Sequence, residues 1–90
     1  MIETSLIISN KLGLHARASS KLVHLASKFS SNATIRVIDE DMTANCKSIM
    51  GLMMLGIVYK TPVTLTIEGE DENEAASAIK TLIQNKFGEE

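Results

Sequence analysis

Apolar and polar residues alternate at the start of the chain. The alternation begins near Ile2 and separates two sets of residues, with Thr4, Leu6 and Ile8 in one and Glu3, Ser5 and Ser9 in the other. A period of two is typical of a strand that presents one face to a core. From about Ala16 the apolar residues instead recur every three or four positions, as far as Phe29. This change of period predicts a first helix, closed by the polar run at 30–32.

Three more strands are predicted further along the chain. Apolar residues at 35–38 lead through an acidic turn into residues 42–45, which is typical of a β-hairpin. Pro62 opens the fourth strand, in which apolar residues alternate with polar ones as far as Ile67. Proline suits the first position of a strand, because no ladder hydrogen bond there depends on its missing N–H.

Two further helices are predicted as well. The apolar spacing over residues 49–53 is helical, Ser48 precedes it as a candidate N-cap, and Gly56 can end it with a left-handed backbone. Asp71, with an acid three residues later, is a candidate N-cap for the third helix. The apolar positions of that helix are Ala75, Ile79, Leu82 and Ile83. Acidic residues at its start and Lys86 near its end complement the helix dipole.

The predicted order of elements is β-α-β-β-α-β-α. An alternating strand has one apolar face, so the three amphipathic helices are expected to pack on the same side of the sheet and to leave the other side in solvent. We therefore predict an open-faced β-sandwich of the α+β class, formed by residues 1–90 as a single domain. No linker composition and no internal repeat divides the chain.

Charge and cysteine content narrow the possible partners and compartments. The formal net charge is −2, whereas nucleic-acid surfaces usually carry a basic stripe, so proteins and small anions are the expected partners. Cys46 is the single cysteine, which excludes an intrachain disulfide and favours a reducing compartment. We expect it to be a small buried side chain rather than a reactive thiol. The first residues lack the pattern of a secretory signal, so we expect a cytoplasmic protein without membrane insertion.

His15 stands at the start of the first predicted helix, two residues after Gly13 and two before Arg17. The unpaired backbone N–H groups of a helix start bind anions. The positive end of the helix also disfavours an imidazolium, so we expect a neutral, nucleophilic ring with a free lone pair. A phosphoryl group on that nitrogen would meet the N–H groups of Ala16 and Arg17, and the Arg17 guanidinium could add charge-assisted hydrogen bonds. This chemistry requires no metal or cofactor.

The G-x-H-x-R spacing by itself leaves a plainer alternative open. A histidine at this position can also be a capping or partly buried structural residue. His24 lies nine residues after His15, about two and a half helical turns, so the two rings should point to opposite sides and cannot share a metal ion. We expect His24 to be a solvated helix residue.

Two motifs carry a resemblance that covers essentially the whole chain. GLHARAS, with KSIMGLMMLG downstream, resembles the HPr family, the histidine phosphocarrier proteins of the bacterial phosphotransferase system. The resemblance implies that His15 is phosphorylated at Nδ1 and that Arg17 contacts the phosphate. It also implies a four-stranded antiparallel sheet covered on one face by three helices.

The chain departs from the family pattern at one position of the first motif. Many members of the family have proline immediately after the arginine, and this chain has Ala18. Alanine is the best intrinsic helix former, so the helix start should survive the exchange. We expect an altered rigidity at the helix start rather than a loss of chemistry.

The second motif adds a regulatory residue and a docking surface. In the family, the serine that matches Ser48 is phosphorylated by an ATP-dependent HPr kinase/phosphorylase where the organism has one. The resemblance also implies a partner-binding patch, formed by Ile49, Met50 and Met53 with Ser20, Lys21 and His24 along its rim. Packing in the core stays open for Met53 and is what we expect for Met54. Steering of partners is expected from four basic residues, namely Arg17, Lys21, Lys47 and Lys60.

The sequence therefore favours a phosphocarrier that takes a phosphoryl group from enzyme I onto His15 and passes it to A components of sugar or regulatory systems. Such a protein is a covalent carrier, expected to be monomeric, rather than an independent enzyme. One alternative is a regulatory adaptor that is read by its phosphorylation state without sugar transport. Another is a small-molecule sensor domain, which would need a ligand pocket between subunits that nothing in the sequence marks.

Overall fold

Strands and helices follow one another in the predicted order in the computed structural model, which describes residues 1–89. Position 90, which the predicted domain includes, lies outside the described residues. The elements are β1 (Ile2–Ile7), α1 (Ala16–Ala26), β2 (Asn32–Val37), β3 (Met42–Asn45), α2 (Ile49–Met54), β4 (Pro62–Glu68), α3 (Glu72–Gln84) and a short 3-10 helix, η1 (Lys86–Gly88).

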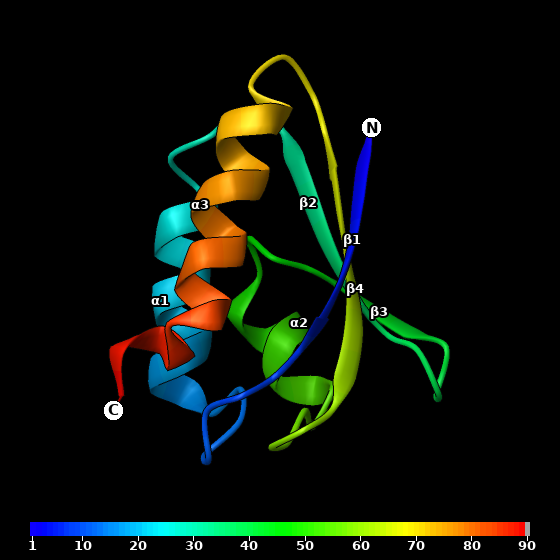
Figure 1. Cartoon of the computed structure of the whole chain (residues 1–90), viewed down its shortest axis with the longest axis vertical. Helices are drawn as coiled ribbons and strands as arrows, with labels where there is room; N and C mark the ends of the chain where they lie inside the picture. Colours follow the sequence, from blue (N-terminus) through cyan, green and yellow to red (C-terminus); the bar gives the residue numbers. More distant parts are fainter. Residues whose placement is uncertain (90) are drawn as a thin grey trace.

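The four strands form one antiparallel sheet in the order β1-β4-β2-β3. Strand β4 lies between β1 and β2, so that Val63 pairs with Leu6 on one side and with Val37 on the other. The predicted β-hairpin is formed by β2 and β3, in which Ile35 lies opposite Ala44. Figure 1 shows the three helices on one side of this sheet. The predicted open-faced sandwich is confirmed.

The core lies between the sheet and the helices. Val63, Leu65 and Ile67 of β4 are at most 1% exposed, as their alternation predicts. Ile79 and Ile83 of α3 are fully buried as well. Residues between the apolar positions of β4 remain partly accessible on the opposite face. Burial of apolar area on one face therefore fixes the register of the sheet, because a shift by one residue would expose the core residues.

The first helix ends earlier than the apolar pattern predicts. Helix α1 stops at Ala26, and the amides of Lys28 and Phe29 bond to carbonyls three residues back, at 3.1 and 3.2 Å. Bonds of that kind tighten the last turn into a 3-10 geometry. Phe29 still packs against the core from this turn. Its place in the apolar pattern therefore reflects its burial, although the residue is not part of the helix.

Asp71 occupies the N-cap position of α3, but its side chain does not cap the helix. Its carboxylate instead accepts hydrogen bonds from the backbone amides of Ser30 and Ser31, at 2.9 and 3.0 Å, and from the Ser31 hydroxyl. These bonds hold the pKa of Asp71 at about 2, below its ordinary value of 3.8. Glu72 reaches back to the Gly69 amide at 3.1 Å. The predicted N-cap position of Asp71 is therefore confirmed, but its side chain makes no capping bond and instead ties α3 to the end of the α1–β2 connection.

Lys86 lies near the end of α3, as predicted, but beyond its last turn, since α3 ends at Gln84 and Lys86 begins η1. Cys46 is fully buried, as expected, and burial raises the pKa of its thiol to about 12. A thiol with that pKa is not a nucleophile at neutral pH. No helix within residues 1–89 is long and apolar enough to cross a membrane.

Candidate functional site

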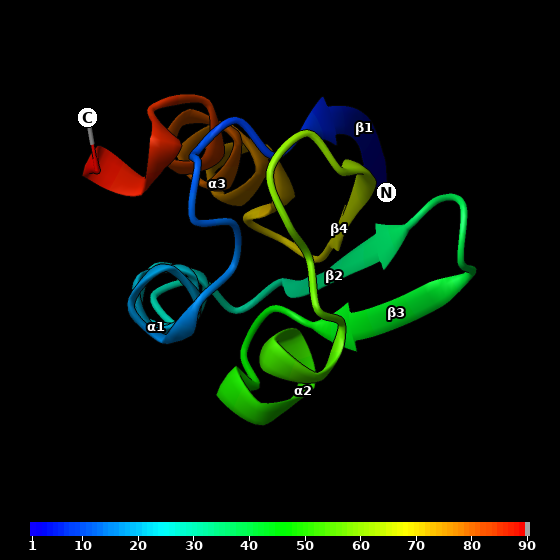
Figure 2. The same cartoon turned by 90° about the horizontal axis from the view of Figure 1, so that it is seen from below.

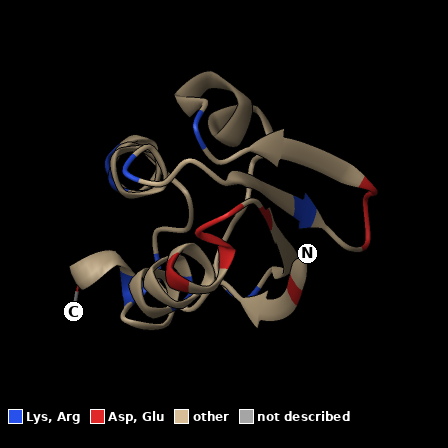
Figure 3. Ribbon diagram, turned by 90° about the horizontal axis from the view of Figure 1, so that it is seen from above, with Lys and Arg blue, Asp and Glu red and all other residues tan. Residues whose placement is uncertain are grey.

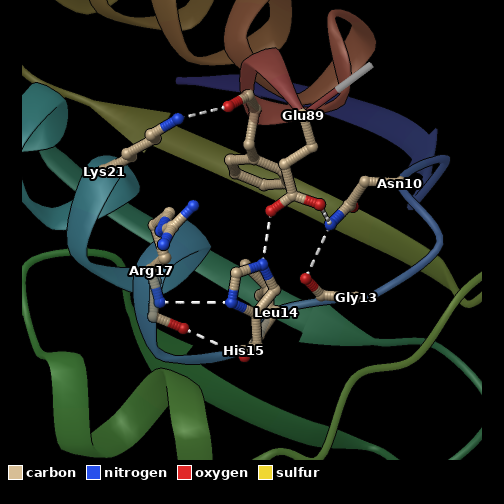
Figure 4. Close-up of polar contacts among 9 residues, drawn as sticks. Asn10, Gly13, Leu14, His15, Arg17, Lys21 and Glu89 are labelled. Carbon is tan, nitrogen blue, oxygen red and sulfur yellow. Dashed lines mark hydrogen bonds and ion pairs between the residues drawn. The ribbon is translucent and has the colours of Figure 1, made fainter.

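His15 is the N-cap residue of α1, as its position after Gly13 predicts. Its backbone is extended, with φ −71° and ψ 179°, and its carbonyl accepts the first helical hydrogen bond from the Ser19 amide at 2.9 Å. The ring atom Nδ1 accepts a hydrogen bond from the Arg17 amide at 3.2 Å. Figure 4 shows the ring beside the start of the helix, with Nδ1 facing that amide. The side chain is 29% exposed, which makes it reachable from solvent.

The loop before His15 is held by short-range and long-range bonds. Gly13 has φ +66°, and its amide bonds to the Asn10 carbonyl at 3.1 Å, which closes a tight turn. The Leu14 amide bonds to the Ile57 carbonyl at 3.0 Å, and the Leu14 side chain is buried. The segment after α2 thus anchors the loop that carries His15. The helix start is a rigid part of the fold and not a free terminus.

The C-terminal turn closes the other side of the imidazole. The carboxylate of Glu89 meets Nε2 of His15, and its second oxygen accepts a hydrogen bond from Nδ2 of Asn10 at 3.1 Å. Asn10 also donates to the Gly13 carbonyl at 2.7 Å, so one amide group binds both the loop and the C-terminal turn (Figure 4). Sequence reasoning missed Glu89 entirely. No local pattern marks it, because the contact joins residues 74 positions apart.

These contacts determine which ring nitrogen of His15 carries the proton. Nδ1 receives an N–H from Arg17 and must therefore supply a lone pair, whereas Nε2 faces a carboxylate and must therefore supply a proton. The hydrogen bond from His15 lowers the pKa of Glu89, with a smaller contribution from Asn10, so Glu89 is an anion at neutral pH. The ring is thus presented to solvent through Nδ1.

The groups around Nδ1 are suited to bind an anion. The amides of the first helical turn have no acceptor within their own helix, and the Arg17 amide already points at Nδ1. The side chain of Arg17 is exposed and makes no polar contact with any other residue that the structure describes. A phosphate on Nδ1 would therefore lie within reach of backbone donors and of a free guanidinium.

Acidic residues gather at the β2–β3 turn and around the start of α3, whereas Arg17 and Lys21 lie on α1 (Figure 3). The charges are not fully separated, since Arg36 of β2 forms an ion pair with Asp41 at 3.3 Å. Lys21 is only partly free, because its Nζ donates to the Phe87 carbonyl at 2.7 Å. Lys47 likewise donates to the Phe29 carbonyl at 2.9 Å. Lys60 stacks over the Tyr59 ring, 5.3 Å from its centroid.

Helix α2 lies beside α1 (Figure 2), and several of its apolar side chains are exposed. All residues predicted for the docking patch and its rim are exposed, namely Ile49, Met50, Met53, Ser20, Lys21 and His24. Met54 is 76% exposed, so its predicted place in the core is wrong. The helix has six residues and turns one face inward, on which Leu52 alone is buried, so Met54 points to solvent. Apolar residues outside the predicted patch are exposed as well, among them Leu12, Val58 and Tyr59.

Ser48 has the capping role that its position predicts. Its hydroxyl accepts a hydrogen bond from the Gly51 amide at 3.0 Å, and the helix ends before Gly56, which has φ +61°.

His24 is exposed and takes no part in the contacts of His15. Within residues 1–89, no group of three or more His, Cys, Asp and Glu side chains could hold a metal ion.

Comparison with known proteins identifies the family. The model of the family described as "PTS HPr component phosphorylation site" matches residues 2–85. The chain belongs to the HPr family, the phosphocarrier proteins of the phosphotransferase system. It is 47% identical to the phosphocarrier protein HPr of Xylella fastidiosa over 90 residues, which cover 100% of this chain and 99% of that protein.

Solved structures agree with this assignment. The structure of HPr-C-His from Thermoanaerobacter tengcongensis matches with a TM-score of 0.93 and 47% identity, covering 100% of this chain and 99% of that one. A second structure, described as an HPr dimer from the same organism, matches with a TM-score of 0.76 and 46% identity, covering 99% and 100% of the two chains. The fold of this HPr-family chain is therefore the one that its motifs imply. Its oligomeric state stays a prediction.

Proposed function

We propose that Nδ1 of His15 accepts a phosphoryl group from phosphorylated enzyme I and passes it to A components of sugar or regulatory phosphotransferase systems. The observation that supports this role is the orientation of the ring, whose lone-pair nitrogen faces the first-turn amide of Arg17. Membership of the HPr family supports the general chemistry. The protein acts as a carrier with a covalent intermediate and not as an enzyme with turnover of its own.

The transfer step needs positioning and charge stabilisation and little else. The Nδ1 lone pair forms the new N–P bond while the bond between phosphorus and the donor breaks, and its electron pair leaves with the donor. The Arg17 amide then donates to a phosphoryl oxygen instead of to Nδ1. The Arg17 guanidinium adds charge-assisted hydrogen bonds to the same oxygens. The reverse sequence delivers the phosphoryl group to the next acceptor.

Partners dock on the exposed apolar surface of α2 and on the rim that α1 contributes. Met50 and Met53 are 72% and 45% exposed and flexible, which suits a surface that must fit both a donor and several acceptors. Such docking is transient and needs only a small interface. We place this exchange in the cytoplasm, where enzyme I and the A components would meet the carrier.

Ser48 is the proposed regulatory residue. A kinase that phosphorylates it would put a doubly charged group at the start of α2, beside Ile49 and Met50. The helix dipole tolerates that charge, whereas an acidic partner docking on the same surface does not. Phosphorylation of Ser48 would thus slow phosphoryl transfer without disturbing the fold.

Labelling with radioactive phosphoenolpyruvate and purified enzyme I tests the assignment of His15. We expect a label on the wild-type chain that is lost in acid and stable in alkali, as a phosphohistidine is. The label should be absent in His15→Ala. His24→Ala removes the other histidine, a rim residue and not the proposed acceptor, so this variant should still form the label even if a weaker rim contact slows its formation. An unlabelled wild-type chain, or a label that survives in His15→Ala, would contradict the proposal.

Onward transfer separates the carrier from the regulatory adaptor. A carrier that is labelled by enzyme I should lose its label when an A component is added. A chain that keeps its label with every A component, while its binding to a kinase, transporter or transcription factor depends on that label, would act as an adaptor.

A further inference from the structure

We propose that Glu89 is a positioning residue for His15, which holds the imidazole in the Nε2–H tautomer and balances the charge that the ring acquires when Nδ1 is phosphorylated. The inference rests on the proposed function of His15. It assigns a role to a residue outside both sequence motifs, at the end of the chain that the structure describes.

The carboxylate of Glu89 is itself fixed in place. One oxygen meets His15 Nε2 and the other accepts from Asn10 at 3.1 Å, so both oxygens have a partner. The side chain is 14% exposed, which is low for a glutamate at the last described position of the chain. Asn10 in turn is fully buried and bonded to the Gly13 carbonyl. The position of the carboxylate therefore follows from the same turn that places His15.

The turn that carries Glu89 is docked by packing and by a hydrogen bond. Phe87 is 1% exposed and belongs to the core, although its backbone adopts the left-handed φ of 56°. Lys21 of α1 donates to the Phe87 carbonyl at 2.7 Å, and Figure 4 shows the Glu89 carboxylate between this bond and the imidazole. A non-glycine residue keeps a left-handed conformation only where its surroundings hold it there. Burial of Phe87 thus holds η1, and with it Glu89, over the start of α1.

The tautomer decides whether Nδ1 can act as the acceptor. In a free imidazole the proton can reside on either nitrogen, and a proton on Nδ1 would leave no lone pair for phosphorus and would face the Arg17 N–H. A carboxylate on Nε2 selects the productive form, as the carboxylate of a Ser-His-Asp triad orients its histidine. Phosphorylation of Nδ1 leaves the proton on Nε2 and makes the ring cationic. The Glu89 anion lies where it can stabilise that charge.

The charged and polar groups that face this dyad all come from residues already described. Asn10 binds the carboxylate, Arg17 lies on the side of Nδ1, and Lys21 holds the turn through a carbonyl while it adds a favourable charge beside Glu89. No other acidic residue among positions 1–89 makes a polar contact with His15. A change at Glu89 therefore removes the single negative partner of the ring within the described chain.

Nitrogen NMR of the His15 ring, combined with the rate of labelling by enzyme I, tests the inference. In the wild type above the pH at which the ring is protonated, we expect the ring nitrogen shifts of the Nε2–H tautomer. In Glu89→Ala the shifts should move toward a mixture of tautomers, and labelling should slow by about tenfold to a hundredfold, as for the loss of a hydrogen bond to a charged group. Glu89→Gln keeps a hydrogen-bond acceptor for Nε2–H but lacks the negative charge. This variant should therefore retain more of the Nε2–H tautomer than Glu89→Ala does, and it should still be labelled more slowly than the wild type.

Glu74→Gln is the matched control, because this glutamate is exposed at the start of α3, and it should change neither readout. Backbone amide spectra show whether each variant is folded. Unchanged ring nitrogen shifts in Glu89→Ala would overturn the inference, and so would a shifted tautomer with an unchanged labelling rate. If the wild-type chain is not labelled at all, the proposed function fails, whereas the ring nitrogen shifts still decide whether Glu89 sets the tautomer.

Discussion

The side-chain amide of Asn10 donates a hydrogen bond of 3.1 Å to the carboxylate of Glu89, although 79 positions separate the two residues. The same amide nitrogen bonds to the Gly13 carbonyl, and the buried Asn10 oxygen has no hydrogen-bond partner among residues 1–89. A buried oxygen without a partner is destabilising, so the burial of Asn10 does not by itself favour the fold. The two hydrogen bonds that its amide nitrogen donates account for its presence at this position. It joins the loop before His15 to the C-terminal turn that covers the imidazole.

Replacing Asn10 with alanine should loosen this connection. We expect Asn10→Ala to lower the free energy of unfolding by about 1–3 kcal/mol, since the Gly13 carbonyl loses its buried partner. The loss is measured by urea denaturation. Hydrogen exchange at the Glu89 amide should also accelerate relative to the core. Asn73→Ala, at an exposed position of α3, serves as the control and should leave both measurements unchanged.

Two glycines with nearly equal backbone angles should respond differently to alanine. Gly13 and Gly56 have φ of +66° and +61°. A Cβ added at Gly13 would lie 2.8 Å from the Val58 Cα, whereas a Cβ added at Gly56 would have no neighbouring atom of the described residues within 4 Å. We expect Gly56→Ala to cost about 1–2 kcal/mol of unfolding free energy from backbone strain. Gly13→Ala should cost at least about 1–3 kcal/mol more, because the backbone after α2 must move. Thermal unfolding compares the two, and equal losses would contradict the close approach at Gly13.

Asp71 should make the stability of the protein depend on pH. Its pKa is about 2 in the folded chain and 3.8 ordinarily, so its contribution is fully present above about pH 5 and is lost progressively as the pH falls through 3.8 toward 2. Asp71→Asn should therefore be less stable than the wild type at pH 7, and the difference should shrink as the pH falls through this range. Urea unfolding at several pH values measures it. Asp39→Asn is the control, since that carboxylate is exposed in the β2–β3 turn.

Substitutions at Ser48 should separate capping from regulation. Ser48→Ala removes the bond to the Gly51 amide and should cost about 1 kcal/mol of unfolding free energy. Ser48→Asp keeps a capping oxygen, so its stability should stay near that of the wild type, while its charge should slow labelling by enzyme I. Ser77→Ala, at an exposed position of α3, should change neither quantity. If Ser48→Asp is labelled at the wild-type rate, partners do not dock beside this residue.

A charge at Met50 should impair docking and leave the fold intact. Met50 is 72% exposed, so Met50→Glu should not change the midpoint of urea unfolding. Labelling by enzyme I should slow by about five- to thirtyfold, which corresponds to 1–2 kcal/mol of docking free energy. Met42→Glu introduces the same change at a partly exposed methionine on β3 and should label at the wild-type rate. Equal rates for both variants would exclude the surface of α2 from the interface.

The sequence by itself determined the layers of the fold and the position of His15 within it. Alternation along β4 and helical spacing in α1 and α3 reflect burial of one face, which is a local property of each segment, so the pattern can be read without the fold. The N-caps at His15 and Ser48 are local for the same reason, because each joins residues two or three positions apart.

The tertiary structure alone decided which groups from distant segments meet. Asp71 has the local sequence of a helix cap, yet its carboxylate binds Ser31, 40 positions away, because those amides point at it once α1 and α3 pack together. Met54 is an apolar residue expected in the core, yet it lies in solvent. Glu89 reaches His15 because the buried Phe87 anchors the last turn over the start of α1. Such contacts depend on how whole helices and strands pack together. The residues next to them in the sequence carry no pattern from which that packing could be predicted.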